Sequence, residues 1–588
     1  MSASANRKVT EARTTFARGA LLSVGVLALL LTSLAPMAGA SVAHPQVSPG
    51  GVWEQFHGDP TLDGVSGSGS TPTNASLFAP VDLTRYASFG TVTSNPYPYQ
   101  ASPVTDGSVV VVAIGNYVLE FSATSGTQVS GWPTAALPGG PNGGPLVGTP
   151  LMTPTAIYVD QAAGNGAGAS MVFAINPTNG SILWQSAPQT CGFSCRSSSS
   201  VAIGAGSLAV ATLGGELAWH PPSAGNLWTY QAANGGAFYD ATPAYTFVAG
   251  LDVSAFVLPS LFGGLEAFQA PPLGGNVAGF PASPPGGFGE TLSSSAAVVN
   301  LTSGGTVNTW AFFGGDAGNG ASSHLWAVDL SQPSVIASVT IPPLGNPSDG
   351  VMGTPAVVVS PTNPNHASVY FATLDGQVMN ATFSWNGGTQ TGFTRGWSFQ
   401  APVSTSFYAS PVVAGGDVLV PGNDAQGTLY AVTTSGGVLD WTARTGSPVY
   451  ASPAVSGGAV YLVTSAGKLY GFGYSPGPGS NSTNGGNASG SDLVYALLAA
   501  LVVIVIVALV VVYVVSRRHH PHVPAHSGHG AHPAPVSTWS PPPPPSSSGA
   551  PPPPPPSTSY PPPPGHGGSG VPPPPTTAEV AYDEPSGG

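Results

Sequence analysis

Charged residues are scarce in this chain. Only 6% of its 588 residues are Asp, Glu, Lys or Arg, of which 24 are acidic and 11 basic. Between residues 42 and 492 there are 20 acidic and five basic residues, which leaves a net of 15 negative charges. A nucleic-acid partner requires a basic surface that replaces phosphate counterions, so this composition excludes nucleic acid.

Familiar catalytic and metal-binding motifs are also missing. The sequence has no His-Glu-x-x-His motif, no phosphate loop and no nucleophile elbow in a strand-to-helix context. Segments 315–320 and 422–427 resemble calcium loops but lack the spaced carboxylates and terminal Glu, and turn chemistry explains their Asn, Asp and Gly residues. The sequence therefore predicts no catalytic, cofactor-binding or metal-ligating residue. No histidine of the central region has a partner at ligand or triad spacing: His44, His57, His220, His324 and His366.

What the sequence does contain is one short phrase, repeated eight times between Tyr99 and Tyr474. Each copy opens on small residues, usually followed by Pro, and continues with short apolar runs separated by Gly, Asn or Asp, the pattern of strands and turns. The copies start at Ala101, Gly148, Ser199, Ala241, Ser294, Gly353, Ala409 and Ala451. Their spacing of about 42 to 59 residues is close to that of propeller blades with four short strands each.

We therefore predict an all-β fold, an eight-bladed β-propeller over residues 84–475. Small side chains fit the crowded inner strands, and Pro, which lacks an N–H, suits the first residues of a strand. A Trp closes several copies and is expected to pack between neighbouring blades, at Trp184, Trp228, Trp397 and Trp441. The last copy ends before such a strand, so we expect residues 84–92 to close the ring by pairing with 467–474, because an open sheet edge invites aggregation.

These phrases resemble the pyrroloquinoline-quinone (PQQ) type propeller repeat, which runs Ser-Pro-hydrophobic, Val-Tyr-Val, Gly-x-Leu-Tyr-Ala and Gly-x-x-x-Trp. The opening segment 53–60 is similar to the Trp-x-x-Phe-x-Gly-Asp-Pro start of such proteins. The resemblance implies either a quinone-dependent dehydrogenase, with PQQ and calcium in the central funnel, or a non-catalytic, membrane-anchored docking propeller. The dehydrogenases carry a vicinal Cys-Cys disulfide that this chain lacks, so we favour the docking branch. The matching residues are Ser410, Pro411, Leu429, Tyr430, Ala431, Trp441, Ser452, Pro453, Tyr461, Leu469 and Tyr470, with Phe173 to Asn176, Asn179, Gly180 and Trp184 in an earlier copy.

Both ends of the chain predict a place in the cell membrane. Residues 1–40 are typical of a secretory signal peptide, with an uncleaved anchor as the alternative. Residues 493–515 are uncharged and contain no Pro or Gly, and this segment is long enough for a transmembrane helix. Arg517 and Arg518, which follow it, predict that this end of the helix lies in the cytoplasm. The prediction is a single-pass type I membrane protein with an extracytoplasmic propeller, joined by a Gly/Ser/Asn linker at 476–492 and preceded by a lead-in segment at 41–83.

Smaller features of the exported and cytoplasmic parts leave alternatives open. In an exported domain Cys191 and Cys195 are expected to form a structural disulfide, with a redox pair as the alternative. The tail, 516–588, is predicted to be disordered. Its six histidines between 519 and 532 form either a loose metal-binding tract or a polar spacer. Its proline runs either dock on a cytoplasmic partner or act as a spacer.

The predicted function is a cell-surface binding or scaffold protein whose propeller contacts an extracellular protein, a glycan or an envelope component. The alternative is a membrane-tethered quinoprotein dehydrogenase or another propeller enzyme. The propeller faces and the insertions at 160–170, 251–264 and 314–324 are the expected binding regions, because inter-strand loops converge there.

Overall fold

The computed structural model describes residues 52–473 with gaps at 68–69, 87–100, 133–136, 139–145, 147, 162–168, 187–188, 191–198, 213–215, 221–227, 233–237, 239–240, 262–263, 271–274, 319–320 and 343–348. The predicted signal peptide, linker, transmembrane helix, tail and cysteine pair lie outside these residues. Among the residues that are described, none forms a helix with the length and apolarity that a bilayer crossing requires.

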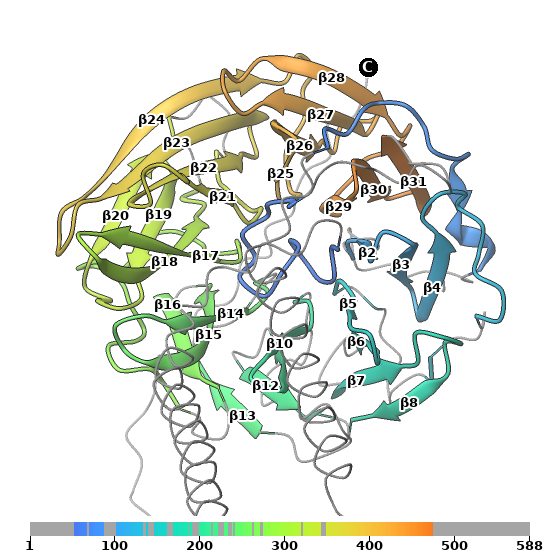
Figure 1. Cartoon of the computed structure of the whole chain (residues 1–588), viewed down its shortest axis with the longest axis horizontal. Coiled ribbons are helices and arrows are strands. Elements are labelled where there is room, and N and C mark those ends of the chain that lie inside the picture. The colour runs from blue at the N-terminus through green and yellow to red at the C-terminus, as the bar shows by residue number, and fades with distance from the viewer. Residues whose placement is uncertain are drawn as a thin grey trace, which may run out of the picture. The chain divides into compact units, whose positions relative to one another are not determined.

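The described residues fold as an all-β propeller, in which antiparallel sheets surround a common centre (Figure 1). The first sheet contains β2 (Val104–Thr105), β3 (Val109–Ile114) and β4 (Tyr117–Ser122), and the second contains β5 (Leu151–Met152), β6 (Ile157–Gln161), β7 (Ala169–Ile175) and β8 (Ile182–Gln185), with β9 (Gln189–Thr190) paired to β7. The third sheet contains β10 (Ala202–Gly204), β11 (Ser207–Ala211), β12 (Glu216–His220) and β13 (Trp228–Gln231). The fourth contains β14 (Ala244–Val248), β15 (Val253–Ser260) and β16 (Gly264–Gln269).

Four further sheets complete the circle. The fifth sheet contains β17 (Ala297–Ser303), β18 (Thr306–Gly314), β19 (His324–Asp329) and β20 (Ile336–Thr340), and the sixth contains β21 (Ala356–Val359), β22 (His366–Ala372), β23 (Gln377–Trp385) and β24 (Thr391–Gln400). The seventh sheet contains β25 (Val412–Ala414), β26 (Asp417–Pro421), β27 (Thr428–Thr433) and β28 (Leu439–Arg444). The last sheet contains β29 (Ala454–Ser456), β30 (Ala459–Val463), β31 (Lys468–Gly473) and β1 (Val81–Asp82). The only helical element of the described residues is a 3-10 turn, η2 (Leu83–Arg85).

The second residue of each repeated phrase is a buried Ser or Thr that joins one sheet to the next. We call these eight residues the hydroxyl ring: Ser102, Thr149, Ser200, Thr242, Ser295, Thr354, Ser410 and Ser452. In seven of the eight steps the backbone N–H of one member donates to the side-chain oxygen of the next, over 2.8 to 3.1 Å. The step from Ser452 back to Ser102 closes the circle. These residues are small because a side-chain oxygen must reach the neighbouring backbone at the crowded centre.

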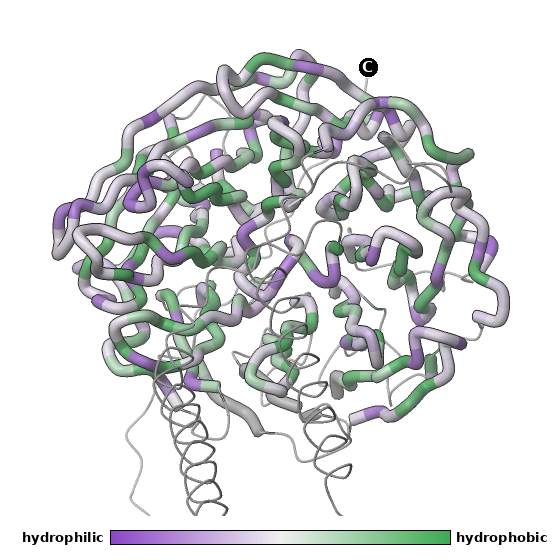
Figure 2. Tube along the Cα trace, in the orientation of Figure 1, coloured by the Kyte–Doolittle hydropathy of each residue, from purple (hydrophilic) through white to green (hydrophobic). Residues whose placement is uncertain are grey.

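Apolar side chains fill the space between neighbouring sheets. The prediction that Trp397 packs between neighbouring sheets is confirmed. Its indole Nε1 donates to the Thr434 carbonyl, 2.8 Å away, in the next sheet, and its ring packs over the turn at Gly437. Any Cβ at Gly437 would collide with that ring. The strands are hydrophobic along much of their length, as Figure 2 shows, and their buried faces form the cores between sheets.

The ring closes between the first and last sheets, with a strand from upstream of the first copy. β1 pairs antiparallel with β31, Val81 opposite Leu469 and Asp82 opposite Lys468. We predicted this strand at residues 84–92, and that position is wrong, because the strand is formed by residues 81–82. Residues 83–85 form η2, and 87–92 lie outside the described residues. Asp82 caps η2 by accepting the Thr84 N–H at 3.0 Å, which ends the strand there. The sheet therefore extends into the segment that we assigned to the lead-in.

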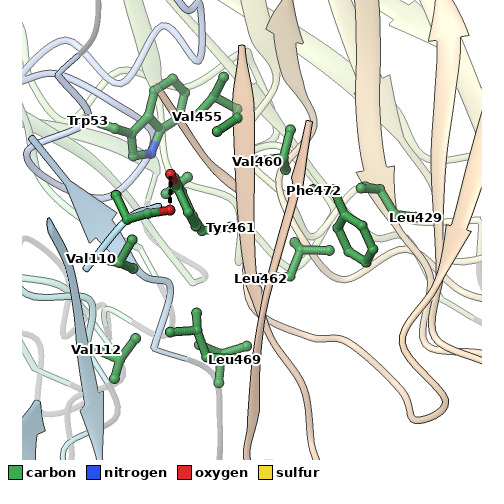
Figure 3. Close-up of a cluster of buried hydrophobic side chains, with 14 of the residues drawn as sticks. Trp53, Val110, Val112, Leu429, Val455, Val460, Tyr461, Leu462, Leu469 and Phe472 are labelled. Atoms are coloured by element: carbon green, nitrogen blue, oxygen red, sulfur yellow. Dashed lines mark hydrogen bonds between the residues drawn. The ribbon is translucent and has the colours of Figure 1, made fainter. Parts of the chain in front are cut away.

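A shared core also seals this junction (Figure 3). Val110 and Val112 of the first sheet lie near Tyr461 and Leu469 of the last. Tyr461 hydroxyl donates to the Ala123 carbonyl at 3.0 Å and so ties the last sheet to the first. Trp53, from the lead-in, is 1% exposed within the same core.

Candidate functional site

The centre of the ring is occupied by the chain's own lead-in. We call residues 53–66 the central turn; they lie at the middle of Figure 1. Their backbone bonds to the inner strands in ring order: Trp53 with Thr105, Glu54 with Met152, Pro60 with Tyr245, Thr61 with Val298, Asp63 with Val357 and Gly64 with Val413, over 2.6 to 2.9 Å. The central turn thus contacts the inner strands of six sheets.

The curvature of the central turn depends on left-handed backbone conformations. Gly58 and Gly64 have φ of 100° and 69°, and His57 and Leu62 have φ of 58° and 56°. An L residue with a side chain adopts this region at a cost of about 1–2 kcal/mol, so the contacts around His57 and Leu62 must offset that cost. His57 provides part of the offset: its Nδ1 lies 2.6 Å from the Leu62 carbonyl oxygen and its Nε2 lies 2.8 Å from that of Pro411.

The central turn also buries two carboxyl groups, and no basic side chain of the described residues is bonded to either. Asp59 accepts hydrogen bonds from the Thr61 N–H at 2.8 Å and hydroxyl at 2.6 Å, and Asp63 accepts the Val65 N–H at 3.0 Å. Burial raises the pKa of Asp59 to about 6. Burial, and then the charge of Asp59, raise the pKa of Asp63 well above its usual range. Burial lowers the pKa of His57, while its two carbonyl contacts act in the opposite direction.

The described residues at the centre do not fit a quinone with a calcium ion. Both ring nitrogens of His57 face backbone carbonyls, and Asp59 and Asp63 bond to their own turn. Trp53 packs between the first and last sheets. Nowhere in the described part of the chain do three or more His, Cys, Asp or Glu side chains gather as a metal site.

A pocket of about 290 Å³ lies off the centre, between the sheet of β14–β16 and the sheet of β17–β20. One wall is the glycine-rich segment 283–292, and the other is formed by Asp316 and Ala317 after β18. The walls are joined where Thr291 and Asp316 exchange two backbone hydrogen bonds, of 2.9 and 3.0 Å. The Asp316 carboxylate accepts the Gly318 N–H at 2.9 Å, which orients it.

Glu290 connects this pocket to His324 and Trp326 at the start of β19. One carboxylate oxygen bonds to His324 Nδ1, and the other accepts Trp326 Nε1–H at 3.0 Å. This contact could not be expected from sequence spacing, because Glu290 lies 34 residues from His324 and on another segment. Gly315 lies directly against Glu290, where a Cβ would collide with Oε2. A Gly that faces a carboxylate has no local sequence pattern that identifies it.

The insertions named from the sequence have different outcomes. Residues 162–168 lie outside the described residues. The segment 251–264 is mostly strand β15 rather than a loop, although its last residue, Gly264, lines the pocket. The segment 314–324 contributes Asp316 and Ala317 to the pocket.

The two calcium-like loops are explained by turn chemistry where they are described. In 422–427, Asp424 accepts the N–H groups of Gln426 at 2.9 Å and Thr428 at 3.3 Å, and the Thr428 hydroxyl at 3.2 Å. These bonds close the turn between β26 and β27.

Comparisons with known proteins agree with the fold. A family model described as outer membrane protein assembly factor BamB, of the PQQ_2 type, matches residues 87–241 and 385–477. A quinohemoprotein alcohol dehydrogenase from Comamonas testosteroni is similar at 12% identity and a TM-score of 0.50, over 73% of this chain and 81% of that one. BamB from Moraxella catarrhalis aligns at 12% identity and a TM-score of 0.41, over 68% and 97%. No curated protein matches significantly.

The repeats, the ring and the family match together define a β-propeller built from PQQ-type repeats. Two stretches of the chain, residues 87–241 and 385–477, are similar to the PQQ-type propeller family. At 12% identity and a TM-score of 0.50, the similarity to the quinohemoprotein alcohol dehydrogenase establishes the fold alone, because propellers host many unrelated functions.

Proposed function

We propose that this protein is a cell-surface binding or scaffold protein whose propeller engages an extracellular protein, glycan or envelope component. The observation that carries the proposal is the central turn. It occupies the place where a cofactor of the dehydrogenase branch would be expected, and its polar side chains bond to the protein itself. Recognition is then left to the faces of the ring and to the pocket between β16 and β18.

The proposal includes the membrane arrangement that the two ends of the sequence predict. Residues 1–40 direct export, 493–515 span the membrane as a helix, and 516–588 extend into the cytoplasm, where the proline runs contact a partner. Each of the eight sheets is one blade, and the eight members of the hydroxyl ring support this count.

Surface location has a direct test, because Lys468 is the only lysine between residues 42 and 588 and it is exposed. A membrane-impermeant amine reagent applied to intact cells that express the full chain should label Lys468, as mapped by mass spectrometry. The Lys468→Arg variant controls for labelling at the amino terminus. Labelling of Lys468 only after cell lysis would contradict an extracytoplasmic propeller.

The enzyme alternative is tested with the full-length protein in detergent, mixed with PQQ and Ca²⁺. We expect no saturable change in the quinone absorbance and no dye reduction with primary alcohols. Saturable binding together with dye reduction would establish the quinoprotein dehydrogenase instead.

A further inference from the structure

Four asparagines of the described part of the chain have the pattern Asn-x-Ser/Thr, with no Pro between, that accepts an N-linked glycan in exported proteins. They are Asn74, Asn179, Asn300 and Asn380, and Asn481 and Asn487 in the same pattern lie outside the described residues. A glycan is bulky and hydrated, so the folded ring accommodates one only where the asparagine side chain reaches solvent. The burial and the contacts of these side chains therefore decide which of the four can carry a glycan.

Two of the four asparagines belong to the sheets. Asn380 lies in β23 and is 8% exposed, and its Nδ2 donates to the Val369 carbonyl at 3.5 Å. Asn300 lies in β17 and is half-buried, and its Oδ1 accepts the Thr309 hydroxyl at 2.8 Å. A glycan on either side chain would break these contacts between neighbouring strands, so the folded ring excludes a glycan at both positions.

Asn74 is exposed, but both ends of its pattern are already engaged. Its Nδ2 donates to the Thr442 carbonyl at 3.4 Å, which holds the lead-in against β28. The hydroxyl of Ser76, the third residue of the pattern, donates to the Phe78 carbonyl at 2.8 Å. That hydroxyl therefore does not bond to the amide of Asn74, and the nitrogen that would receive a sugar is itself a donor to the ring.

Asn179 is presented in a different way, at the exposed turn between β7 and β8 (Figure 1). The hydroxyl and the N–H of Ser181 both donate to its Oδ1, over 2.8 and 3.0 Å, in the local turn that short polar side chains form with nearby backbone. These two donors make the Nδ2 protons of Asn179 more acidic, because they stabilise negative charge on the amide. Among the described residues none accepts a hydrogen bond from that Nδ2, so the nitrogen is available to an incoming sugar.

The strand that follows this turn exposes apolar side chains at a sheet edge. β8 is the last strand of the second sheet, and its Ile182 and Leu183 are 40% and 48% exposed. Ile175 lies opposite Ile182 and Ala174 opposite Trp184, so Leu183 is the extra residue of a bulge. An exposed apolar edge invites pairing with a second chain. A hydrated glycan attached three residues before Ile182 would stand beside this edge and block that pairing.

We propose that Asn179 carries an N-linked glycan that shields the outer edge of β8. The proposal rests on the export proposed above and adds a modification site to the exported ring. The donor is a sugar joined to a lipid through a diphosphate. A bond forms between the anomeric carbon of the sugar and Asn179 Nδ2, and the bond from that carbon to the diphosphate oxygen breaks. The lipid diphosphate leaves with the electron pair, and Nδ2 loses one proton.

The test is peptide mapping by mass spectrometry of the full-length protein, recovered from cells that glycosylate their exported proteins. We expect a glycan mass on Asn179 and none on Asn300 or Asn380. The same turn supplies a matched control in Asn176, whose Oδ1 accepts the Thr178 N–H at 2.8 Å. Its sequence is Asn-Pro-Thr, and the Pro prevents glycan transfer, so Asn176 should remain unmodified.

Two substitutions of Ser181 separate the glycan from the asparagine itself. Ser181→Ala keeps Asn179 but removes the hydroxyl of the pattern, and should abolish the glycan mass. Ser181→Thr restores a hydroxyl and should retain it. Without its glycan the Ser181→Ala protein should form larger species in size-exclusion chromatography in detergent, and Leu183→Ser in the same chain should restore a single species.

The labelling of Lys468 on the same intact cells distinguishes the two proposals. If Lys468 is labelled and Asn179 is bare, the surface function stands and the glycan proposal is overturned. A glycan that is present on Asn179, but whose loss leaves the Ser181→Ala protein as monodisperse as the unsubstituted chain, would overturn the shielding of β8. Neither label nor glycan would contradict both proposals.

Discussion

The inner strands and the central turn lie next to each other, but their residues hold the ring together in different ways. Seven of the eight members of the hydroxyl ring each make one short contact with the next sheet, and the same chemistry recurs from copy to copy. The central turn makes a different contact with each of six inner strands, through one unrepeated segment. Figure 2 shows that this central segment includes hydrophilic residues, whereas the surrounding strands are largely hydrophobic.

This difference has a thermodynamic consequence. One repeated contact can be lost while six similar ones remain, so each should contribute little stability by itself. The central turn joins distant sheets, and it depends on strained conformations and buried carboxyl groups. Because all these contacts come from one continuous segment, we expect its substitutions to have larger effects than those of the hydroxyl ring.

The largest effect is expected from deletion of residues 52–83, which removes both the central turn and β1. The ring should fail to close, because the centre and the outer edge of β31 are then uncovered. Size-exclusion chromatography in detergent should show aggregate. A monodisperse, protease-resistant product would mean that the repeats close the ring unaided.

Substitution of Gly64 by Ala should be the next most damaging change. Its φ is 69°, and a Cβ would lie 2.3 Å from His57 Cε1. The strain and the collision together should cost about 3 kcal/mol or more of unfolding free energy. Gly206→Ala is the matched control: its φ is 72°, but a Cβ there meets no atom within 4 Å, so only the backbone strain remains. Equal melting temperatures for the two variants would contradict the role of His57.

The buried carboxyl groups should make the protein more stable as the solution becomes more acidic, whereas His57, whose pKa is lowered by burial, acts in the opposite direction. Burial raises the pKa of Glu54, Asp59, Asp63, Glu120, Asp329 and Asp417, to about 6 for Asp59 and Asp417 and about 7 for Glu120. A carboxyl group whose pKa is higher in the folded protein than in the unfolded chain stabilises the folded protein. This stabilisation is complete below the pKa of the unfolded chain, near 4, and is lost as the pH rises through the pKa of the folded protein, at 6 to 7. The raised pKa of Asp59 alone corresponds to roughly 2–3 kcal/mol of unfolding free energy.

Thermal unfolding between pH 5 and pH 8 measures this dependence. The melting temperature should fall by several degrees across that interval. Asp63→Asn retains an acceptor for Val65 but carries no charge, and should flatten the profile. A melting temperature that rises toward pH 8 would show that the buried carboxyl groups of the central turn are stabilised in their charged form.

The smallest effects are expected in the hydroxyl ring, where the chain supplies a matched pair. Thr149→Val leaves the buried N–H of Ser102 without its acceptor and should cost about 1–2 kcal/mol. Thr354 is equally buried, but its hydroxyl has no hydrogen-bond partner, so Thr354→Val should be neutral or slightly stabilising. Chemical denaturation gives both values, and identical losses would mean that packing rather than hydrogen bonding matters at these positions.

Much of the architecture was predictable, because it repeats. The small-residue starts indicated the inner strands, and Trp397 packs between sheets as predicted. The closing strand was placed several residues too late, because Asp82 ends it by capping η2, a local contact that competes with the pairing. The contact between Glu290 and His324 could not be predicted, since neither residue lies in a motif and 34 residues separate them.

The sequence alone determined an all-β ring of PQQ-type repeats, because strand periodicity and small-residue starts are local properties that recur in each copy. Only the tertiary structure decided what fills the ring. The central turn reaches six sheets through backbone groups, which carry no side-chain signature. The pocket forms where Thr291 and Asp316 meet, two segments that the sequence does not relate. Long-range contacts of this kind depend on the whole ring being closed, and so they become visible only in the folded molecule.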